Sequence, residues 1–371
     1  MNDSKKRDHK RVAVVGGGFG GLSVAIHLCL KGFEVTLYEA NKSVGGRASQ
    51  IKADGFTFDT GPTLLNYPWV FEELFNSAGL RLDEYVDLQI IDPSIRYYWP
   101  KGDCLQLTSN MTALVQEFER MEEGSSTGLF AFLADASAKY HIAMEKMACR
   151  NIDSHLKWFS SLSLKEFLQT SMWRSLDKEL CRFFKNRLIR EALGSYSMYL
   201  GGSPQGLSGI FTILPYGEIA MGLWLPRGGI FALVKAAETL ARRVGVQILT
   251  EQQVEKILIR NNQVVGLKLA KGSLDDYPIV VSNVDVPQTH HCLLSGNGIR
   301  IPKPLKMTPS VMTFYLGVRG KIPNASHHTI FMPHNPEKSY REIIKKKKIP
   351  EELAFYVNIA SKAECCRGPV R

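Results

Sequence analysis

A glycine-rich turn between a strand and a helix constrains this chain more than any other feature. The apolar, β-branched run Arg11–Val15 predicts a buried strand, and the sequence Gly16-Gly17-Gly18-Phe19-Gly20-Gly21 follows it directly. Residues 22–31 carry apolar side chains at helical spacing, and residues 33–38 form a second apolar run. This order predicts a βαβ unit and hence an α/β fold with a parallel sheet.

The glycines of this turn have the spacing Gly16-x-Gly18-x-x-Gly21, which is typical of a dinucleotide site. Gly16 permits the tight turn, Gly18 lets the backbone approach a pyrophosphate, and Gly21 lets the helix pack closely on the strand. The helix N-terminus adds N–H groups for the phosphates. Glu39, at the end of the second strand, is predicted to accept both ribose hydroxyls of an adenosine, and its charge would repel the 2′-phosphate of NADP. The alternative is a bare glycine turn without a ligand.

A second glycine pair follows six residues after Glu39, in the sequence Gly45-Gly46-Arg47. Two adjacent glycines let the backbone approach a ligand, and the Arg47 guanidinium suits a phosphate. The alternative is a surface turn with a solvated arginine. On these residues alone the dinucleotide could be NAD or FAD.

The middle of the chain predicts a mostly helical region. Residues 95–99 and 104–107 flank a turn and predict a β-hairpin, and helical periodicity then covers residues 111–122, 128–147 and 163–193. Strand and helix patterns alternate again from residue 233.

We therefore expect a nucleotide-binding domain that is interrupted by an insertion. Its first part is residues 1–90 and its second part is residues 226–300. The insertion, residues 91–225, is a mostly helical substrate domain with a short β-hairpin, and residues 301–371 return to its strands.

The composition is that of a globular protein. With 44% hydrophobic and 22% charged residues, the 371-residue chain is neither disordered nor fibrous. The seven cysteines show no CxxC pair and no zinc-ligand spacing, and the charged N-terminus lacks the apolar core of a secretory signal, so we expect a cytoplasmic protein. The nine histidines form no metal-ligand pattern, and no metal site is predicted.

The formal net charge of +10 has two interpretations. The excess of basic residues lies at residues 5–11 and 345–348, and it either attracts an anionic surface or is solvated surface charge. Neither cluster is accompanied by a nucleic-acid motif, so nucleic acid is not an expected partner.

Six stretches give the chain a family resemblance. They are residues 56–63, 199–204, 213–216, 225–230, 249–257 and 281–285. Together with residues 12–63 they resemble the amine oxidase/phytoene desaturase superfamily and, more closely, FAD-dependent carotenoid desaturases of the bacterial phytoene desaturase and dehydrosqualene desaturase type. The resemblance runs from about Arg11 to Lys362 and implies a Rossmann-like FAD-binding domain interrupted by a mostly helical, membrane-associated substrate domain.

The resemblance implies FAD as the cofactor, because the glutamate followed after five residues by Gly-Gly-Arg marks FAD in that family. It implies the following cofactor-binding positions: Gly16, Gly18, Phe19, Gly20, Gly21, Glu39, Ala40, Gly45, Gly46, Arg47, Gly61, Pro62, Thr63 and Val254. The backbone around Val254 is expected to hold the adenine. No catalytic residue is assigned.

The implied reaction is the desaturation of a carotenoid polyene such as phytoene or a thirty-carbon analogue, with hydride transfer from an allylic carbon to flavin N5. A lipophilic polyene substrate implies contact with a membrane surface, and the apolar residues 208–225 could line a substrate tunnel, lie in the interface as a monotopic anchor, or form ordinary core. The oligomeric state is not predicted.

Four alternatives share some or all of these motifs. They are a carotenoid oxygenase, a retinol-saturase-like enzyme, a flavin amine oxidase and a non-catalytic flavoprotein fragment. The last follows from a departure from the family, whose second flavin motif near the C-terminus has no counterpart before Arg371. On this basis we expect a truncated member.

Overall fold

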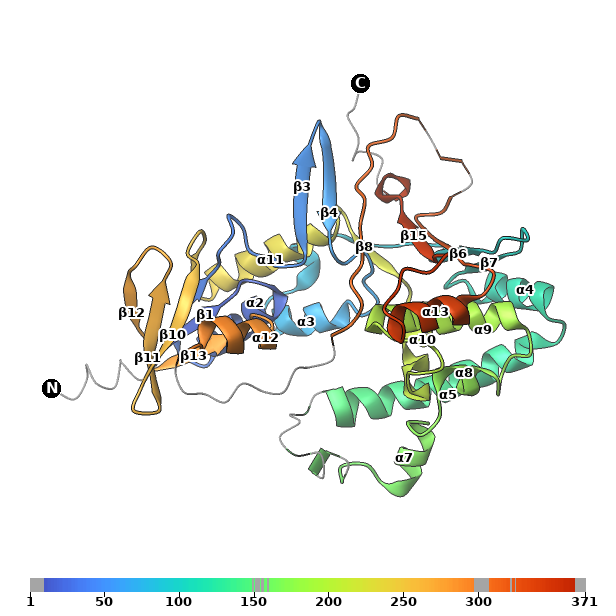
Figure 1. The fold of residues 1–371 in the computed structure, drawn as a ribbon, viewed down its shortest axis with the longest axis horizontal. Coiled ribbons are helices and arrows are strands. Elements are labelled where there is room, and N and C mark those ends of the chain that lie inside the picture. The colour runs from blue at the N-terminus through green and yellow to red at the C-terminus, as the bar shows by residue number, and fades with distance from the viewer. Residues whose placement is uncertain are drawn as a thin grey trace. The chain divides into compact units, whose positions relative to one another are not determined.

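The computed structural model describes residues 10–363 except 149, 151–153, 155–156, 159, 297–306, 321 and 324. The described residues form two compact units, the first from residues 10–89 and 225–307 and the second from residues 90–224 and 308–363 (Figure 1). Residues 5–9, which belong to the first basic cluster, and residues 364–371 at the end of the chain lie outside the described residues.

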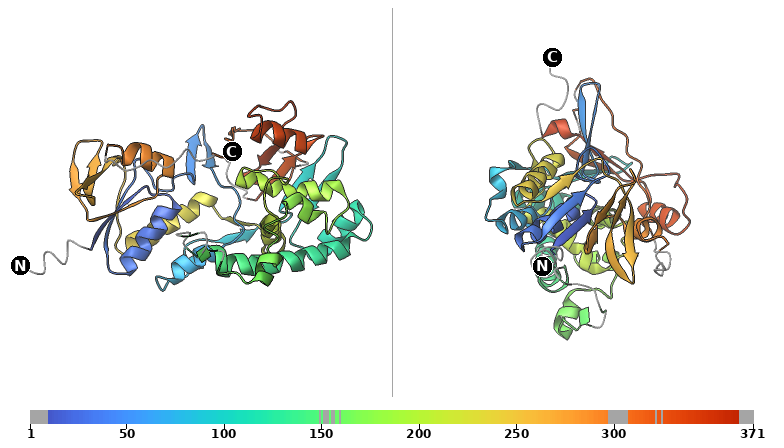
Figure 2. Two further views of the ribbon diagram at one scale, coloured as in Figure 1. Left: turned by 60° about the horizontal axis from the view of Figure 1, so that its bottom comes forward. Right: turned by 90° about the vertical axis from the view of Figure 1, so that its left-hand side faces the viewer.

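A four-stranded sheet forms the centre of the first unit. Its order is β13-β1-β2-β9, and all neighbours are parallel. Side chains of β1 alternate between its two faces. Ala13 and Val15 pack with residues of the antiparallel sheet β10-β11-β12, while α2 and α11 pack against each other and α2 against β1 and β2 (Figure 2). The mixed α/β fold expected from the glycine turn is confirmed.

The elements of the first unit are β1 (Arg11–Val15), α2 (Phe19–Leu30), β2 (Glu34–Tyr38), β3 (Ser49–Ala53), β4 (Phe56–Thr60), α3 (Trp69–Asn76), η1 (Leu82–Glu84), β5 (Leu88–Ile90), β8 (Trp224–Pro226), α11 (Ile230–Arg243), β9 (Gln247–Leu249), β10 (Val254–Arg260), β11 (Gln263–Leu269), β12 (Leu274–Asp276), β13 (Ile279–Ser282), α12 (Val286–Gln288) and η5 (Thr289–Leu293). β5 and β8 lie at the ends of this unit's segments and pair as a two-stranded sheet, and the last residue of β5, Ile90, and the first of β8, Trp224, are counted with the second unit.

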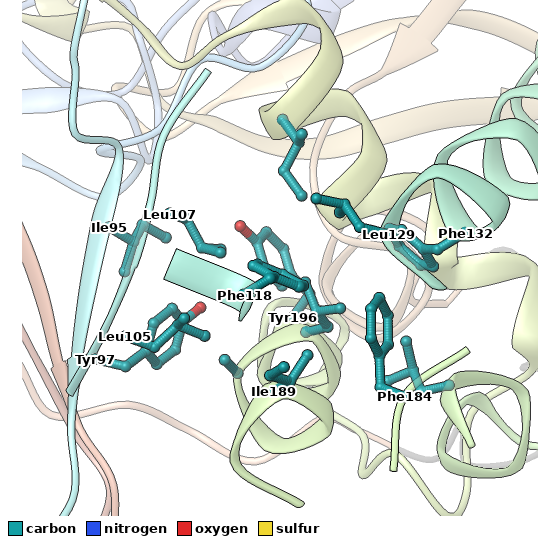
Figure 3. Close-up of a cluster of buried hydrophobic side chains, with 14 of the residues drawn as sticks. Ile95, Tyr97, Leu105, Leu107, Phe118, Leu129, Phe132, Phe184, Ile189 and Tyr196 are labelled. Atoms are coloured by element: carbon teal, nitrogen blue, oxygen red, sulfur yellow. The ribbon is translucent and has the colours of Figure 1, made fainter. Parts of the chain in front are cut away.

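The second unit packs helices on one mixed sheet, β15-β14-β6-β7. Ile95 and Tyr97 of β6 and Leu105 and Leu107 of β7 meet Phe118, Leu129, Phe132, Phe184, Ile189 and Tyr196 (Figure 3). All ten side chains are buried, and they form the core of this unit. The β-hairpin expected between residues 95 and 107 is confirmed, because β6 and β7 pair antiparallel.

The elements of the second unit are β6 (Ile95–Tyr98), β7 (Cys104–Leu107), α4 (Met111–Met121), α5 (Ser125–Ile142), the π-helical η2 (Ala143–Ala148), α7 (Leu164–Gln169), α8 (Leu176–Leu180), α9 (Arg187–Gly194), η3 (Ser195–Leu200), η4 (Gly209–Thr212), α10 (Ile213–Met221), β14 (His328–Phe331), α13 (Pro336–Ile344), β15 (Phe355–Asn358) and η6 (Ala360–Lys362).

The expectation of continuous helical structure over residues 163–193 is wrong. The structure has three short helices, α7, α8 and α9, each of which begins at its own side-chain cap: Ser163, Ser175 and Asn186. Each cap accepts a hydrogen bond from a backbone N–H group of the first turn, which favours a new helix start over continuation of the previous helix.

The apolar stretch 208–225 is mostly buried. Ile210, Ile219, Leu223 and Leu225 have little or no exposed surface, and Phe211 and Trp224 are half-buried. This burial favours the core interpretation over an interfacial anchor. Among the described helices, none combines the length and apolar character needed to cross a bilayer.

Candidate functional site

The glycine turn closes between β1 and α2 in a geometry that needs glycine. Gly16 has φ +97°, and its N–H donates to the Tyr38 carbonyl at 2.9 Å. A Cβ atom on Gly21 would lie 2.0 Å from the Gly16 carbonyl oxygen. The chain can therefore turn from strand to helix this tightly only without side chains at these two positions.

The N-terminus of α2 has no side-chain cap. Gly18 is the N-cap residue and offers no side-chain acceptor, and the first turn contains no acidic residue. The first N–H groups of a helix have no partner within the helix, and the helix dipole adds positive potential there. The donors at this end of α2 fit a phosphate better than they fit any side chain of the turn itself.

Glu39 lies beside this turn and is buried. Its Oε2 accepts from the Gly17 N–H at 2.8 Å, and its Oε1 accepts from the Asn41 backbone N–H at 2.9 Å and side-chain Nδ2 at 2.7 Å. A carboxylate has about four acceptor positions, so one remains for a ligand hydroxyl. Displacement of the Asn41 side chain would provide the second position that a ribose diol needs.

The second glycine pair lies directly against the first turn. The Gly45 N–H donates to the Gly17 carbonyl at 2.8 Å, and a Cβ atom on Gly46 would lie 3.2 Å from the Gly18 Cα. Gly61, after β4, approaches the same loop, since its Cβ would lie 2.1 Å from the Arg47 carbonyl oxygen. Three segments distant in sequence thus meet with only backbone between them.

The segment between β9 and β10 lies beside Glu39 in the first unit. The Glu39 N–H donates to the Leu249 carbonyl at 2.9 Å, and the Gln252 N–H donates to the Glu39 carbonyl at 2.9 Å. Val254 begins β10 and is buried. The hydrogen bonds therefore bring the segment that leads to Val254 to the residue expected to hold the ribose.

The remaining predicted positions lie in the same segments. Phe19 opens α2 and packs edge-to-face on Phe71, with 5.2 Å between ring centroids. Ala40 follows Glu39 and is exposed, as is Pro62, and Thr63 is half-buried.

Arg47, predicted to contact phosphate, is paired in this structure with Asp285, at 3.0 Å from Nη2 to Oδ1.

Two residues of the site were not predicted. The Asn283 side chain lies against the glycine turn, where a Cβ on Gly20 would come within 2.6 Å of its Nδ2. Asp285 pairs with Arg47. Both belong to the stretch 281–285 used for the family resemblance, so the signal was present in the sequence but carried no role.

The second unit holds an isolated buried carboxyl group, Glu218 of α10. Its Oε1 accepts from Ser94 Oγ at 2.5 Å, and its Oε2 has no hydrogen-bond partner among the described residues. Burial raises the pKa of Glu218 to about 7, although the hydroxyls of Ser94 and Tyr196 oppose this shift. Within the described residues, no cluster of His, Cys, Asp and Glu is arranged to hold a metal ion.

Comparisons with known proteins agree with this geometry. A family model described as flavin containing amine oxidoreductase matches residues 19–316. The zeta-carotene-forming phytoene desaturase of Myxococcus xanthus is 32% identical over 362 residues, which are 97% of this chain and 70% of the relative. The 4,4'-diapolycopene oxygenase of Methylomonas is 30% identical, covering 98% and 73%, and a phytoene desaturase of Cercospora nicotianae is 31% identical, covering 96% and 58%.

Solved structures show the same fold at low sequence identity. A Rab GDI from Plasmodium falciparum has a TM-score of 0.55 at 11% identity, covering 88% of this chain and 75% of its own. A putrescine oxidase variant has a TM-score of 0.54 at 14% identity, covering 76% and 59%. At these identities the likeness supports the fold and nothing further.

Proposed function

The chain belongs to the flavin-containing amine oxidoreductase family, in its carotenoid desaturase group, and we propose that it removes hydrogen across a carbon–carbon single bond of a carotenoid polyene. The cofactor is FAD. The site around α2 supports the cofactor, with an uncapped helix N-terminus, a buried acceptor at Glu39 and close-packed glycine loops in one unit. The observation that carries the choice of a polyene is the identity of 30–32% to relatives that are named for phytoene and diapolycopene.

The residues of the first unit have separate parts in holding the cofactor. With FAD bound, the N–H groups at the start of α2 would hold the pyrophosphate, and Glu39 would hold the ribose. The loops at Gly45 and Gly61 would leave room for close approach, and Arg47 could exchange the Asp285 carboxylate for a phosphate oxygen. The positions proposed from the sequence act as one site in this assignment.

FAD supplies the hydride acceptor when it is bound. The new double bond also requires loss of a proton from the neighbouring carbon, and conjugation with the existing double bonds stabilises the developing charge. The second unit contributes the substrate domain, whose part is to orient a long apolar chain and to keep water away from it.

Contact with a membrane surface is part of the proposal, because the substrate partitions into lipid. Leu164 and Leu168, one helical turn apart on α7, are both exposed, and they are the residues proposed to enter the interface. Flotation with anionic liposomes tests this, and Leu164→Asp/Leu168→Asp is expected to abolish it. Unchanged flotation of that variant would reject the assignment.

The reaction is tested with the purified chain loaded with FAD and freed of excess cofactor. Under anaerobic conditions, phytoene in liposomes is expected to bleach the flavin absorption and to produce a longer-wavelength polyene spectrum. Putrescine serves as the comparison substrate. Bleaching by putrescine and not by phytoene would identify an amine oxidase instead, and stoichiometric flavin without bleaching by either would contradict the proposed activity.

A further inference from the structure

Three aromatic rings form a row across adjacent strands in the second unit. Phe331 of β14 is in register with Tyr98 of β6 on one side and with Phe355 of β15 on the other. The ring centroids of Tyr98 and Phe331 lie 5.5 Å apart at an interplanar angle of 18°, and those of Phe331 and Phe355 lie 4.6 Å apart at 16°. The strand pairing thus stacks these rings, here called the aromatic row.

The aromatic row lies on the sheet face that the core does not use. Neighbouring residues in a strand point to opposite faces. Tyr97 and Ile330, next to Tyr98 and Phe331 in sequence, are buried in the core against the helices. Phe355, in contrast, is 55% exposed.

A hollow of about 370 Å³ lies beside the aromatic row, within the range of small-molecule sites. Its lining includes Trp99, Met332 and Leu353, so it is mostly apolar. The lining also includes His334 and Glu352, which contact each other: the His334 backbone N–H donates to Glu352 Oε2 at 2.9 Å, and His334 Nδ1 lies 3.1 Å from Glu352 Oε1. Every lining residue belongs to the second unit.

We propose that this hollow binds a conjugated segment of the polyene, an inference that rests on the proposed function. Stacking covers the faces of Phe331, so this ring presents its positive edge, which suits the π electrons of a polyene. The lining is mostly apolar, with Trp99, Met332 and Leu353 beside the aromatic row, so it favours a hydrocarbon chain over an ammonium group, which would lose hydration there.

The test uses parinaric acid, a fluorescent conjugated tetraene, added to the full chain. Phe355→Ala is expected to raise the dissociation constant of the probe about tenfold, because an aromatic contact contributes both buried area and edge-to-face attraction. Phe130→Ala is the matched control, since Phe130 is 52% exposed on α5 of the same unit. If Phe355→Ala does not fold, Leu353→Ala tests the same lining.

Competition identifies the ligand class. A carotenoid aldehyde is expected to displace the probe, whereas stearic acid is expected to compete at least tenfold more weakly and putrescine not at all. Equal binding to Phe355→Ala and Phe130→Ala would overturn the site, and displacement by putrescine or equal displacement by stearic acid would overturn its assignment to a polyene.

The probe needs neither flavin nor turnover, so the two proposals can fail separately. Desaturation with no effect of Phe355→Ala on binding would refute this inference alone. Phe355-dependent binding without desaturation would refute the proposed function alone.

Discussion

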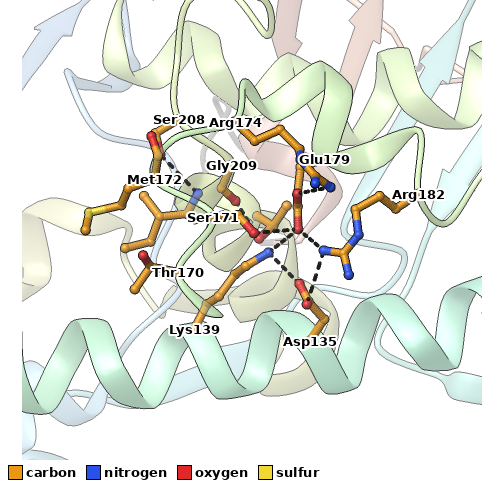
Figure 4. A network of polar contacts seen from close by, with 12 residues as sticks. Asp135, Lys139, Thr170, Ser171, Met172, Arg174, Glu179, Arg182, Ser208 and Gly209 are labelled. Carbon is orange, nitrogen blue, oxygen red and sulfur yellow. Dashed lines mark hydrogen bonds and ion pairs between the residues drawn. The ribbon is translucent and has the colours of Figure 1, made fainter. Parts of the chain in front are cut away.

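Replacing Glu179 by glutamine is expected to destabilise the second unit by about 3 kcal/mol, because a buried lysine then keeps only one of its two carboxylate partners. Lys139 of α5 and Glu179 of α8 are both fully buried, and Lys139 Nζ lies 2.6 Å from Glu179 Oε1 (Figure 4). Removing one partner of a buried pair typically costs about 3–5 kcal/mol. Asp135 also binds Lys139, so the lower end of that range applies.

Replacing the other partner, Lys139, by methionine is expected to cost about half as much stability. In Lys139→Met, Glu179 still accepts from Ser171 Oγ at 3.0 Å and pairs with Arg182 and Arg174, so no buried charge is left alone. The double variant Lys139→Met/Glu179→Gln is expected to be more stable than Glu179→Gln, since it removes a buried charge that Asp135 alone would have to balance.

Urea unfolding followed by tryptophan fluorescence measures these differences. Four of the five tryptophans, Trp99, Trp158, Trp173 and Trp224, lie in the second unit, so the signal reports mainly on that unit. With a slope of about 2–3 kcal/mol per molar urea, Glu179→Gln lowers the midpoint by about 1–1.5 M. Glu351→Gln, at an exposed pair with Lys338, is the matched control and is expected to leave the midpoint unchanged.

The reasoning is refuted if Glu179→Gln lowers the midpoint no more than Glu351→Gln does. It is also refuted if Lys139→Met lowers the midpoint more than Glu179→Gln does. The number of partners that remain for the buried charge would then not determine the loss of stability.

Three further predictions concern the cofactor site and pH. Gly21→Ala is expected to abolish retention of flavin through gel filtration, because its Cβ would lie 2.0 Å from the Gly16 carbonyl oxygen. The control Gly32→Ala, whose Cβ would have no atom within 4 Å, is expected to cost about 1 kcal/mol of stability and to retain flavin. Equal retention by both variants would contradict the close approach. Arg47→Ala is expected to weaken FAD binding, measured by flavin fluorescence, and to reduce the salt dependence of that binding. Asp285→Asn is expected to tighten FAD binding, because it frees Arg47 from its ion pair. If both variants change the affinity for FAD in the same direction, the proposed exchange of partners at Arg47 is rejected. Glu218 has a folded-state pKa of about 7, raised by burial from 4.5, so its contribution to stability is full below about pH 4.5 and is lost as the pH rises through about 7. Urea midpoints of the parent protein should therefore fall between pH 5 and 8 more steeply than those of Glu218→Gln, and parallel profiles would contradict this.

Local sequence predicted the start of the first unit well. The strand at Arg11–Val15, the glycine turn and the strand ending before Glu39 lie within thirty residues and were confirmed as β1, α2 and β2. Each depends on its own periodicity and turn chemistry, which a short stretch of sequence displays.

Two further local features of the sequence indicate structure that the sequence analysis did not predict: a hairpin turn and two helix caps. Asp54-Gly55, a typical hairpin turn, joins β3 and β4, and both residues have positive φ, +50° and +80°. The residues that divide the expected helix at 163–193 are Ser175 and Asn186, typical helix caps whose short polar side chains compete with continuation of a helix.

The contacts that sequence could not predict join residues far apart in the chain. The Arg47–Asp285 pair spans 238 residues, and no spacing rule connects its members. The same holds for the aromatic row: β14 pairs with β15 nearby in sequence but with β6 more than 200 residues earlier, and only this register places Tyr98, Phe331 and Phe355 side by side. Phosphate recognition uses backbone N–H groups at one turn and is therefore local. Recognition of an apolar chain instead requires a surface assembled from several strands. The cofactor could therefore be predicted from a motif, whereas the hollow proposed for the substrate became visible only with the strand pairing.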